Sequence, residues 1–117
     1  MMNTLLAWVA HPWLMLLAAG ALEVVWALGL PRTQGFTRLW PSLWVLGAMA
    51  ASFVLLASAV RTIPVSIAYP IWVGIGATGA YVGGVLILGD KWQPLHLLFI
   101  AMIVGGVVGL KAVGHTP

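Results

Sequence analysis

Residues 41 to 88, PSLWVLGAMAASFVLLASAVRTIPVSIAYPIWVGIGATGAYVGGVLIL, consist of two apolar runs joined by the short stretch RTI. A helix rises about 1.5 Å per residue, so about 20 apolar residues cross the roughly 30 Å hydrocarbon core of a bilayer. Each run is long enough to cross it, and the short connection allows only a reversal of direction. The stretch therefore predicts a hairpin of two transmembrane helices.

Two more apolar runs flank this hairpin, one before it and one after it. An earlier start of the first run near Leu5, with His11 and Pro12 as an irregular entry, stays open. The connecting stretches PRTQGFTRLW, RTI and GDKWQ hold the polar, glycine and proline residues that end helices. We expect an all-α membrane protein, a single domain over residues 1–117, with four transmembrane helices at about 13–30, 41–60, 64–88 and 94–113.

The composition excludes several classes of protein. Hydrophobic residues make up 62% of the chain and charged residues 6%, whereas a soluble domain has about 25% charged residues. The five basic residues stand singly between apolar runs, so they form no nucleic-acid patch. The chain has no cysteine, and its histidines and two acids lack metal-ligand or catalytic spacing. We expect no enzyme activity, no metal and no cofactor.

Residues 74 to 79, GIGATG, match the glycine pattern of dinucleotide-binding loops. That pattern acts only between a strand and a helix of a βαβ unit, with an acid about 20 residues on. Here it lies inside an apolar run, so nucleotide binding is not expected.

The basic residues are nearly balanced between the two sides of the expected bundle. Arg32, Arg38 and Lys91 fall on one side, and Arg61 and Lys111 on the other. Because an excess of positive charge in cytoplasmic loops sets orientation, three against two is almost no bias. Copies inserted in opposite orientations can pair as an antiparallel, dual-topology dimer of eight helices.

Glu23 is the one acid inside an expected transmembrane helix, in the stretch GALEVVWALGL at residues 20–30. A central acid costs roughly 2.5 to 3.5 kcal/mol on insertion scales, so such a residue marks an ion or proton site by default. The alternative is a permanently protonated side chain that bonds a neighbouring helix. Helical spacing places Gly20 and Trp26 on the face of Glu23.

Other polar side chains can join this site. Ser52 either bonds the carbonyl four residues before it, as serines in membrane helices often do, or bonds Glu23 and fixes its carboxylate. Tyr69 and Trp72 are three residues apart and share a face, and each carries a polar tip that needs a partner when buried. We expect these side chains to line the same pocket.

Two groups of residues concern helix shape and association. Pro70 either kinks the third helix or begins it, and Gly74, Gly76 and Gly79 weaken the helix and make its centre flexible. In the fourth helix, Gly105 and Gly109 form a G-x-x-x-G pattern, which allows two helices to approach closely and indicates dimer packing. A lipid-facing position of these two glycines is the alternative.

Taken in order, LEVVWALGL, GFTRLWPS, IPVSIAYPIWVGIGATGA and VVGLK resemble the small multidrug resistance transporters, and most closely their guanidinium exporter subtype. The resemblance implies a multi-pass protein of the bacterial inner membrane that forms an antiparallel homodimer. It further implies that this dimer exchanges protons for guanidinium. It also implies that Glu23 is the central carboxylate. The substrate-site neighbours that it carries over are Gly20, Trp26, Ser52, Tyr69 and Trp72.

The sequence departs from the family pattern at several places. Pro31 stands where lysine is frequent, Asp90 replaces a more familiar glutamate, and the N-terminus is about ten residues longer. Pro70 stands where alanine is usual, between Tyr69 and Trp72. Pro70 can therefore reshape the pocket, or indicate a chain that works as half of a heterodimer.

We therefore expect a proton-coupled antiporter that exports small cations, guanidinium above all, through a glutamate site shared by two chains. A carboxylate matches the paired N–H donors of planar guanidinium, and aromatic walls attract cations. The first alternative is a broader exporter of quaternary ammonium and other drug cations. Further alternatives are a structural membrane subunit and an ion channel.

Overall fold

The computed structural model describes residues 11–113, and over this range it contains four α-helices and no strand. All four are long and apolar enough to cross a bilayer, which confirms the expected all-α chain with four potential spans. The expected earlier start near Leu5 lies outside the described residues. The helices are α2 (Pro12–Thr33), α3 (Leu39–Ala59), α4 (Val65–Leu86) and α5 (Pro94–Val113).

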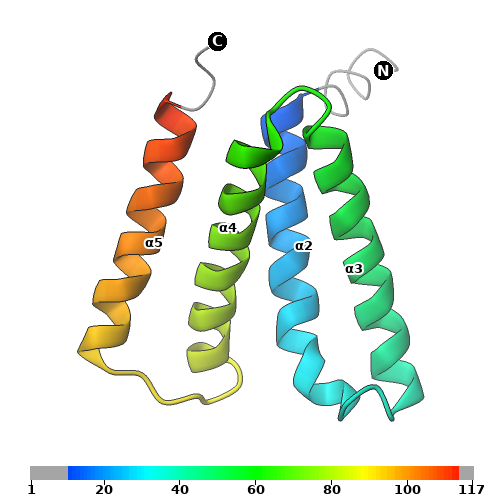
Figure 1. The fold of residues 1–117 in the computed structure, drawn as a ribbon. Helices are drawn as coiled ribbons and strands as arrows, with labels where there is room; N and C mark the ends of the chain where they lie inside the picture. The colour runs from blue at the N-terminus through cyan, green and yellow to red at the C-terminus, as the bar shows by residue number, and fades with distance from the viewer. Residues whose placement is uncertain (1–10, 114–117) are drawn as a thin grey trace, which may run out of the picture.

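The helices stand side by side in the spatial order α5, α4, α2, α3 (Figure 1). They alternate in direction along the chain, so the neighbours α4 and α2 run parallel to each other (Figure 1). Helix α2 packs against both α3 and α4, and α5 packs against α4. The α2–α3 and α4–α5 connections lie at one end of the bundle. The α3–α4 connection lies at the other end, together with the start of α2 and the end of α5 (Figure 1).

Helix α2 continues beyond the expected end at Leu30, through Pro31 to Thr33. A proline removes only one backbone bond in a last turn, so the helix continues through it. Thr33 is buried; its hydroxyl donates to the Leu30 carbonyl (2.7 Å) and accepts from the Phe36 amide (3.2 Å). Gln34 then adopts a left-handed conformation and ends the helix.

Helix α4 runs without interruption from Val65 and contains Pro70 in its second turn. The alternative in which Pro70 begins the helix and residues 64–69 form a loop is therefore wrong. Pro64 occupies the N-cap position, so the helix begins directly after the α3–α4 connection. The helix ends at Leu86, and Gly89 with a φ of 77° reverses the chain.

Small residues bring α2 close to both of its neighbours. A Cβ on Gly29 would overlap the Trp44 ring and Val45 of α3. A Cβ on Gly83 would overlap Leu28 of α2. Close backbone approach is the usual basis of helix association in a bilayer, where lipid is as apolar as the helix surface. The buried core between these helices comprises Leu16, Ala19, Ala59, Ile63, Ala68, Ile71 and Trp72.

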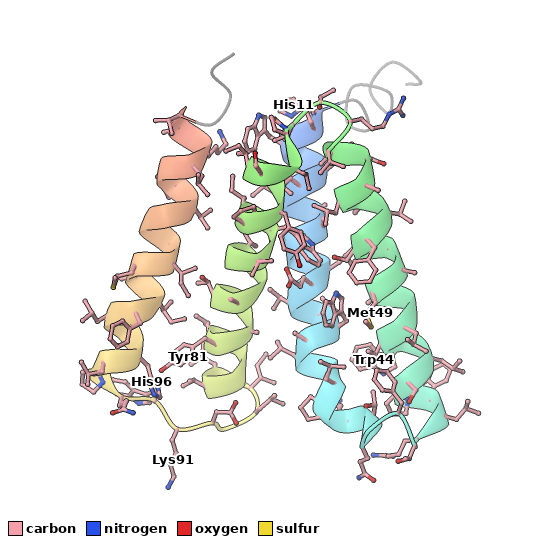
Figure 2. The ribbon with its side chains drawn as sticks, in the orientation of Figure 1. His11, Trp44, Met49, Tyr81, Lys91 and His96 are labelled. Atoms are coloured by element: carbon pink, nitrogen blue, oxygen red, sulfur yellow. The ribbon has the colours of Figure 1, made fainter. Side chains whose placement is uncertain are left out.

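Helix α5 has no buried residue. Near the α4–α5 connection, Tyr81 of α4 and His96 of α5 face each other (Figure 2), with 3.0 Å between the phenol oxygen and Nδ1. At the opposite end, the Lys111 ammonium lies 5.0 Å from the centre of the Trp13 ring. Between these two anchors, α5 offers a largely apolar surface, including Phe99 and Met102.

Candidate functional site

Glu23 lies near the middle of α2 and is half-buried against α4. Gly76 of α4 directly faces its carboxyl group: a Cβ at Gly76 would overlap the Cδ and Oε1 atoms of Glu23. Oε1 is buried and has no hydrogen-bond partner within residues 11–113. Buried polar atoms are nearly always paired, so an unpaired buried oxygen is unusual. The expected role of Glu23 as the proton and cation site stays a prediction.

Trp26, one turn further along α2, presents a second unpaired polar atom. Its indole Nε1 is buried and has no acceptor among the described residues. Its ring meets the ring of Phe53 edge-on, with 6.3 Å between the centres. Helix α2 thus offers an unpaired acceptor and an unpaired donor one turn apart on the same face, as the spacing of Glu23 and Trp26 predicts.

Ser52 of α3 is completely buried and joins three helices. Its hydroxyl donates to the Ala19 carbonyl of α2 (2.7 Å) and accepts from the indole N–H of Trp72 of α4 (3.1 Å). Both alternatives predicted for the hydrogen bond of the Ser52 hydroxyl are therefore wrong, since the hydroxyl bonds neither a carbonyl of its own helix nor Glu23. The reason is packing: the small Ala19 lets α3 reach the α2 backbone one turn before Glu23.

The bond from Ser52 has a consequence for Glu23. In a regular α-helix, the carbonyl of Ala19 is also the acceptor for the amide of Glu23, four residues on. Ser52 therefore binds the turn of α2 that carries the carboxylate. Through the same hydroxyl it orients Trp72, so one side chain connects the acid-bearing helix to the aromatic residues of α4.

Four aromatic rings form a row that crosses the three helices. Tyr69 lies 5.5 Å from Trp72, Trp72 lies 5.7 Å from Phe53, and Phe53 lies 6.3 Å from Trp26, between ring centres. Tyr69 and Trp72 share a face, as their spacing predicts. Phe53 was not expected in the row; its position directly after Ser52 was the available signal. We call these four residues the aromatic row.

A groove of about 360 Å³ adjoins the aromatic row between α3 and α4. Its walls are almost entirely apolar, and Phe53, Tyr69 and Trp72 form one side of it. Glu23 does not line this groove. In a single chain, the carboxylate therefore lies beside Gly76 and not in this groove.

Gly20 lies apart from the aromatic row. It is buried at the contact between α2 and α4, where a Cβ would lie 2.6 Å from Cγ2 of Ile75. Gly20 therefore allows α2 to pack closely against Ile75 of α4. Its role as a substrate neighbour stays a prediction.

The glycines of α4 also lie at helix contacts. A Cβ at Gly74 would overlap Val107 of α5, and a Cβ at Gly79 would overlap Val24 of α2. Pro70 is exposed. The expected flexibility of Pro70, Gly74, Gly76 and Gly79 stays a prediction, while the structure adds a second reason for small residues at the three glycine positions.

Gly105 and Gly109 lie on an open face of α5. A Cβ at either position would meet no atom within 4 Å, and both residues are exposed. Their expected role in dimer packing stays a prediction. Within residues 11–113, no group of three or more His, Cys, Asp or Glu side chains is arranged to hold a metal ion.

The chain is similar to known membrane proteins over most of its length. Residues 11–103 match the family described as Small Multidrug Resistance protein. A guanidinium exporter of Citrobacter freundii is 52% identical over 103 residues, which are 88% of this chain and 98% of that one. A guanidinium exporter of Escherichia coli (strain K12) is 48% identical over the same shares of the two chains. The matched residues include Glu23, Ser52 and the aromatic row.

Proposed function

The chain belongs to the Small Multidrug Resistance protein family, and on that premise we propose that it is a multi-pass transporter that exports guanidinium. Family membership confirms the resemblance that the helix motifs indicated. The observation that supports a planar cation is the unpaired Oε1 of Glu23, on the same face of α2 as Trp26 of the aromatic row. The names of the relatives point to the same substrate.

The chemistry of guanidinium suits this arrangement. The cation is planar and presents parallel N–H donors, which a carboxylate accepts bidentately in short, charge-assisted bonds. The indole and phenol rings of the aromatic row supply faces that attract a cation, most strongly where water is excluded. Glu23 provides the charge and the two acceptors, and Trp26 and Trp72 provide the aromatic surroundings.

Proton coupling follows from competition for one carboxylate. A protonated Glu23 has lost its charge and one acceptor, so it releases the cation; a deprotonated Glu23 binds the cation again. If the two glutamates of a dimer take up two protons for each guanidinium exported, one net positive charge moves inward. That movement gains about 2.3 kcal/mol per 100 mV of membrane potential, in addition to the pH difference.

The transporting unit is an antiparallel dimer in the bacterial inner membrane. The near balance of basic residues between the two ends of the bundle supports insertion in both orientations. The open glycine face of α5 supports pairing with a second copy. Two inverted chains bring two Glu23 side chains toward the middle of the membrane, a common plan among transporters.

The test is guanidinium uptake into liposomes that contain the full chain, driven by an imposed pH difference. Glu23→Gln removes the charge, one acceptor and the titrating group with little change of shape, so the pH difference no longer drives uptake. Guanidinium binding falls by about 100-fold, as expected when a charge-assisted bond is lost. Asp90→Asn is the matched control, because Asp90 is the other acid and lies exposed in the α4–α5 connection. It leaves uptake unchanged.

Undiminished guanidinium exchange by Glu23→Gln would remove Glu23 from the coupling role. A flux that follows its own gradient but is never driven uphill by the pH difference would identify a channel. If adding cations to the solubilised protein releases no protons, the chain is a structural subunit rather than an antiporter.

A broader cation exporter is the second candidate, and the groove between α3 and α4 is the observation that favours it. The groove begins at Tyr69 and Trp72 and is apolar, so it can receive a large apolar substituent on a bound cation. A binding series from guanidinium to a bulky aromatic quaternary ammonium distinguishes the two. Tight binding of the bulky cation with no binding of guanidinium would overturn guanidinium as the substrate.

The same series tests the homodimer. If the purified chain alone binds neither cation but gains binding when a related chain is co-expressed, the functional unit is a heterodimer.

A further inference from the structure

A second groove lies on the other side of α4, where α2, α4 and α5 meet. It has a volume of about 400 Å³ and is almost entirely apolar. Trp13 and Leu17 of α2, Ile75 of α4, and Val107 and Val108 of α5 form its walls, and Lys111 stands at its end. We call it the Lys111 groove. It shares no residue with the groove beside the aromatic row.

The Lys111 groove has the length of one leaflet. A smaller hollow of about 210 Å³, lined by Thr78 and Val104 among others, continues it, and Ile75 and Val107 line both spaces. Together they extend along α5 from Val104 to Ala112, about 12 Å of helix rise. Half of the roughly 30 Å hydrocarbon core is about 15 Å. The groove therefore fits one hydrocarbon chain of one leaflet.

The charged end of the groove lies at the membrane boundary. Lys111 is in the last turn of α5, and its ammonium lies over the Trp13 ring near the start of α2. Tryptophan is enriched at the level of lipid headgroups, and a lysine near a helix end directs its ammonium to the same level. An apolar groove that ends in a held ammonium is complementary to an amphipathic anion.

The proposed dimer face leaves the α4 side of this groove and its charged end uncovered. At 100° per residue, Val107 lies about 180° and Lys111 about 140° from the midpoint of Gly105 and Gly109 on α5. Val108 and Ala112, which also line the groove, lie about 80° and 40° from that midpoint. Val107 is half-buried against α4, while a Cβ at Gly105 or Gly109 would meet open space. A second copy packed on the two glycines therefore approaches the groove at Ala112 and leaves the wall at Val107 and the Lys111 end facing lipid.

We propose that the Lys111 groove is a binding site for an anionic phospholipid. One acyl chain lies in the groove along Ile75 and Val107, and the phosphate lies against the Lys111 ammonium. Basic pockets between transmembrane helices bind anionic headgroups in this way. The bound lipid fills the space that α5 leaves beside α2 and α4, and so supports the helix that has no buried residue among the four described helices.

The test is native mass spectrometry of the purified full chain in detergent, with equal amounts of phosphatidylglycerol and phosphatidylcholine that carry the same acyl chains. The chain retains phosphatidylglycerol in preference. Lys111→Gln lowers the retained phosphatidylglycerol by about fivefold, the effect of one basic residue at a membrane surface, and Lys111→Arg keeps it. Arg61→Gln is the matched control, because Arg61 lies at the same end but in the α3–α4 connection.

A second variant tests the apolar wall. Leu17→Trp fills the groove from α2, without touching the glycine face of α5, and lowers the retention of both lipids. Four results would overturn the proposal: equal retention of both lipids by the unaltered chain, an equal loss with Arg61→Gln, full displacement of phosphatidylglycerol by inorganic phosphate, or dissociation into monomers caused by Lys111→Gln. The last two identify a free-anion site and a second copy of the chain as the occupant.

Discussion

Within residues 11–113, helices α2, α3 and α4 form a joined unit, whereas α5 contacts it along α4 and through Lys111 over the Trp13 ring. In the unit, Ser52 bonds two other helices, and glycines on α2 and α4 lie directly against side chains of the neighbouring helix. Helix α5 has no buried residue, and its three glycines face open space. Both regions are rich in apolar residues, but α2, α3 and α4 bury some of theirs and α5 buries none.

The difference shows what holds this chain together. Lipid is as apolar as leucine, so an apolar surface alone does not drive one helix onto another in a bilayer. Close approach at small residues and bonds between helices do so. Helices α2, α3 and α4 are joined in both ways at several positions, whereas α5 is joined by the contact of Val107 with Gly74 and by the bond between Tyr81 and His96. The glycines of α5 itself have nothing to pack against among the described residues.

Among the substitutions that test the α2–α4 unit and α5 separately, Gly76→Ala is expected to have the largest effect. The new Cβ overlaps the end of the Glu23 side chain, so the carboxylate moves while the helices keep their positions. Guanidinium affinity falls by about 10- to 100-fold, the contribution of one hydrogen bond to a charged group. Isothermal titration calorimetry measures the loss.

Gly47→Ala is the matched control for Gly76→Ala. Gly47 lies on α3 and a Cβ there meets nothing within 4 Å, so affinity stays as in the unaltered chain. Equal affinity of the two variants would show that Gly76 does not position Glu23.

Gly109→Leu is expected to weaken association of two chains and to leave the site of each chain intact. The leucine finds open space within its own chain but prevents close approach of a second α5. Loss of one such contact weakens the dimer by about tenfold, which energy transfer between labelled chains in liposomes measures.

Gly106→Leu keeps the dimer, because Gly106 is equally open but points about 80° away from the midpoint of Gly105 and Gly109. Dimers that are equally stable in both variants would place the interface on another face.

Ser52→Ala is expected to have the smallest effect. It removes the bonds to Ala19 and Trp72 and leaves the buried Trp72 indole without its acceptor. Bonds between helices in a bilayer contribute about 0.6 kcal/mol each on average, so guanidinium affinity falls about 3- to 10-fold.

Ser42→Ala is its control, since Ser42 is also buried on α3 but bonds the Arg38 carbonyl at the start of its own helix. An equal effect of both serine variants would mean that the connection from Ser52 to α2 and α4 does not orient the site.

The sequence predicts a large part of the candidate site. Glu23 and Trp26 could be placed on one face, and Tyr69 with Trp72 on another, because spacing along a helix determines direction. The partners of Ser52 could not be predicted, since a hydroxyl can bond its own helix or a neighbour, and the choice depends on which backbone lies within reach. The place of Phe53 in the aromatic row and the contact of Gly76 with Glu23 were not predicted for the same reason, since each depends on a residue of another helix.

By itself, the sequence determined the number of potential spans, their reversal of direction along the chain and the single acid among them, because hydropathy and helix geometry are local properties. Tertiary structure decided which helices touch. It set Gly76 against Glu23, joined Ala19, Ser52 and Trp72, and left the glycines of α5 uncovered. The physical reason is that helices in a bilayer associate through the fit of particular surfaces, and that fit exists only once the neighbouring helix is in place.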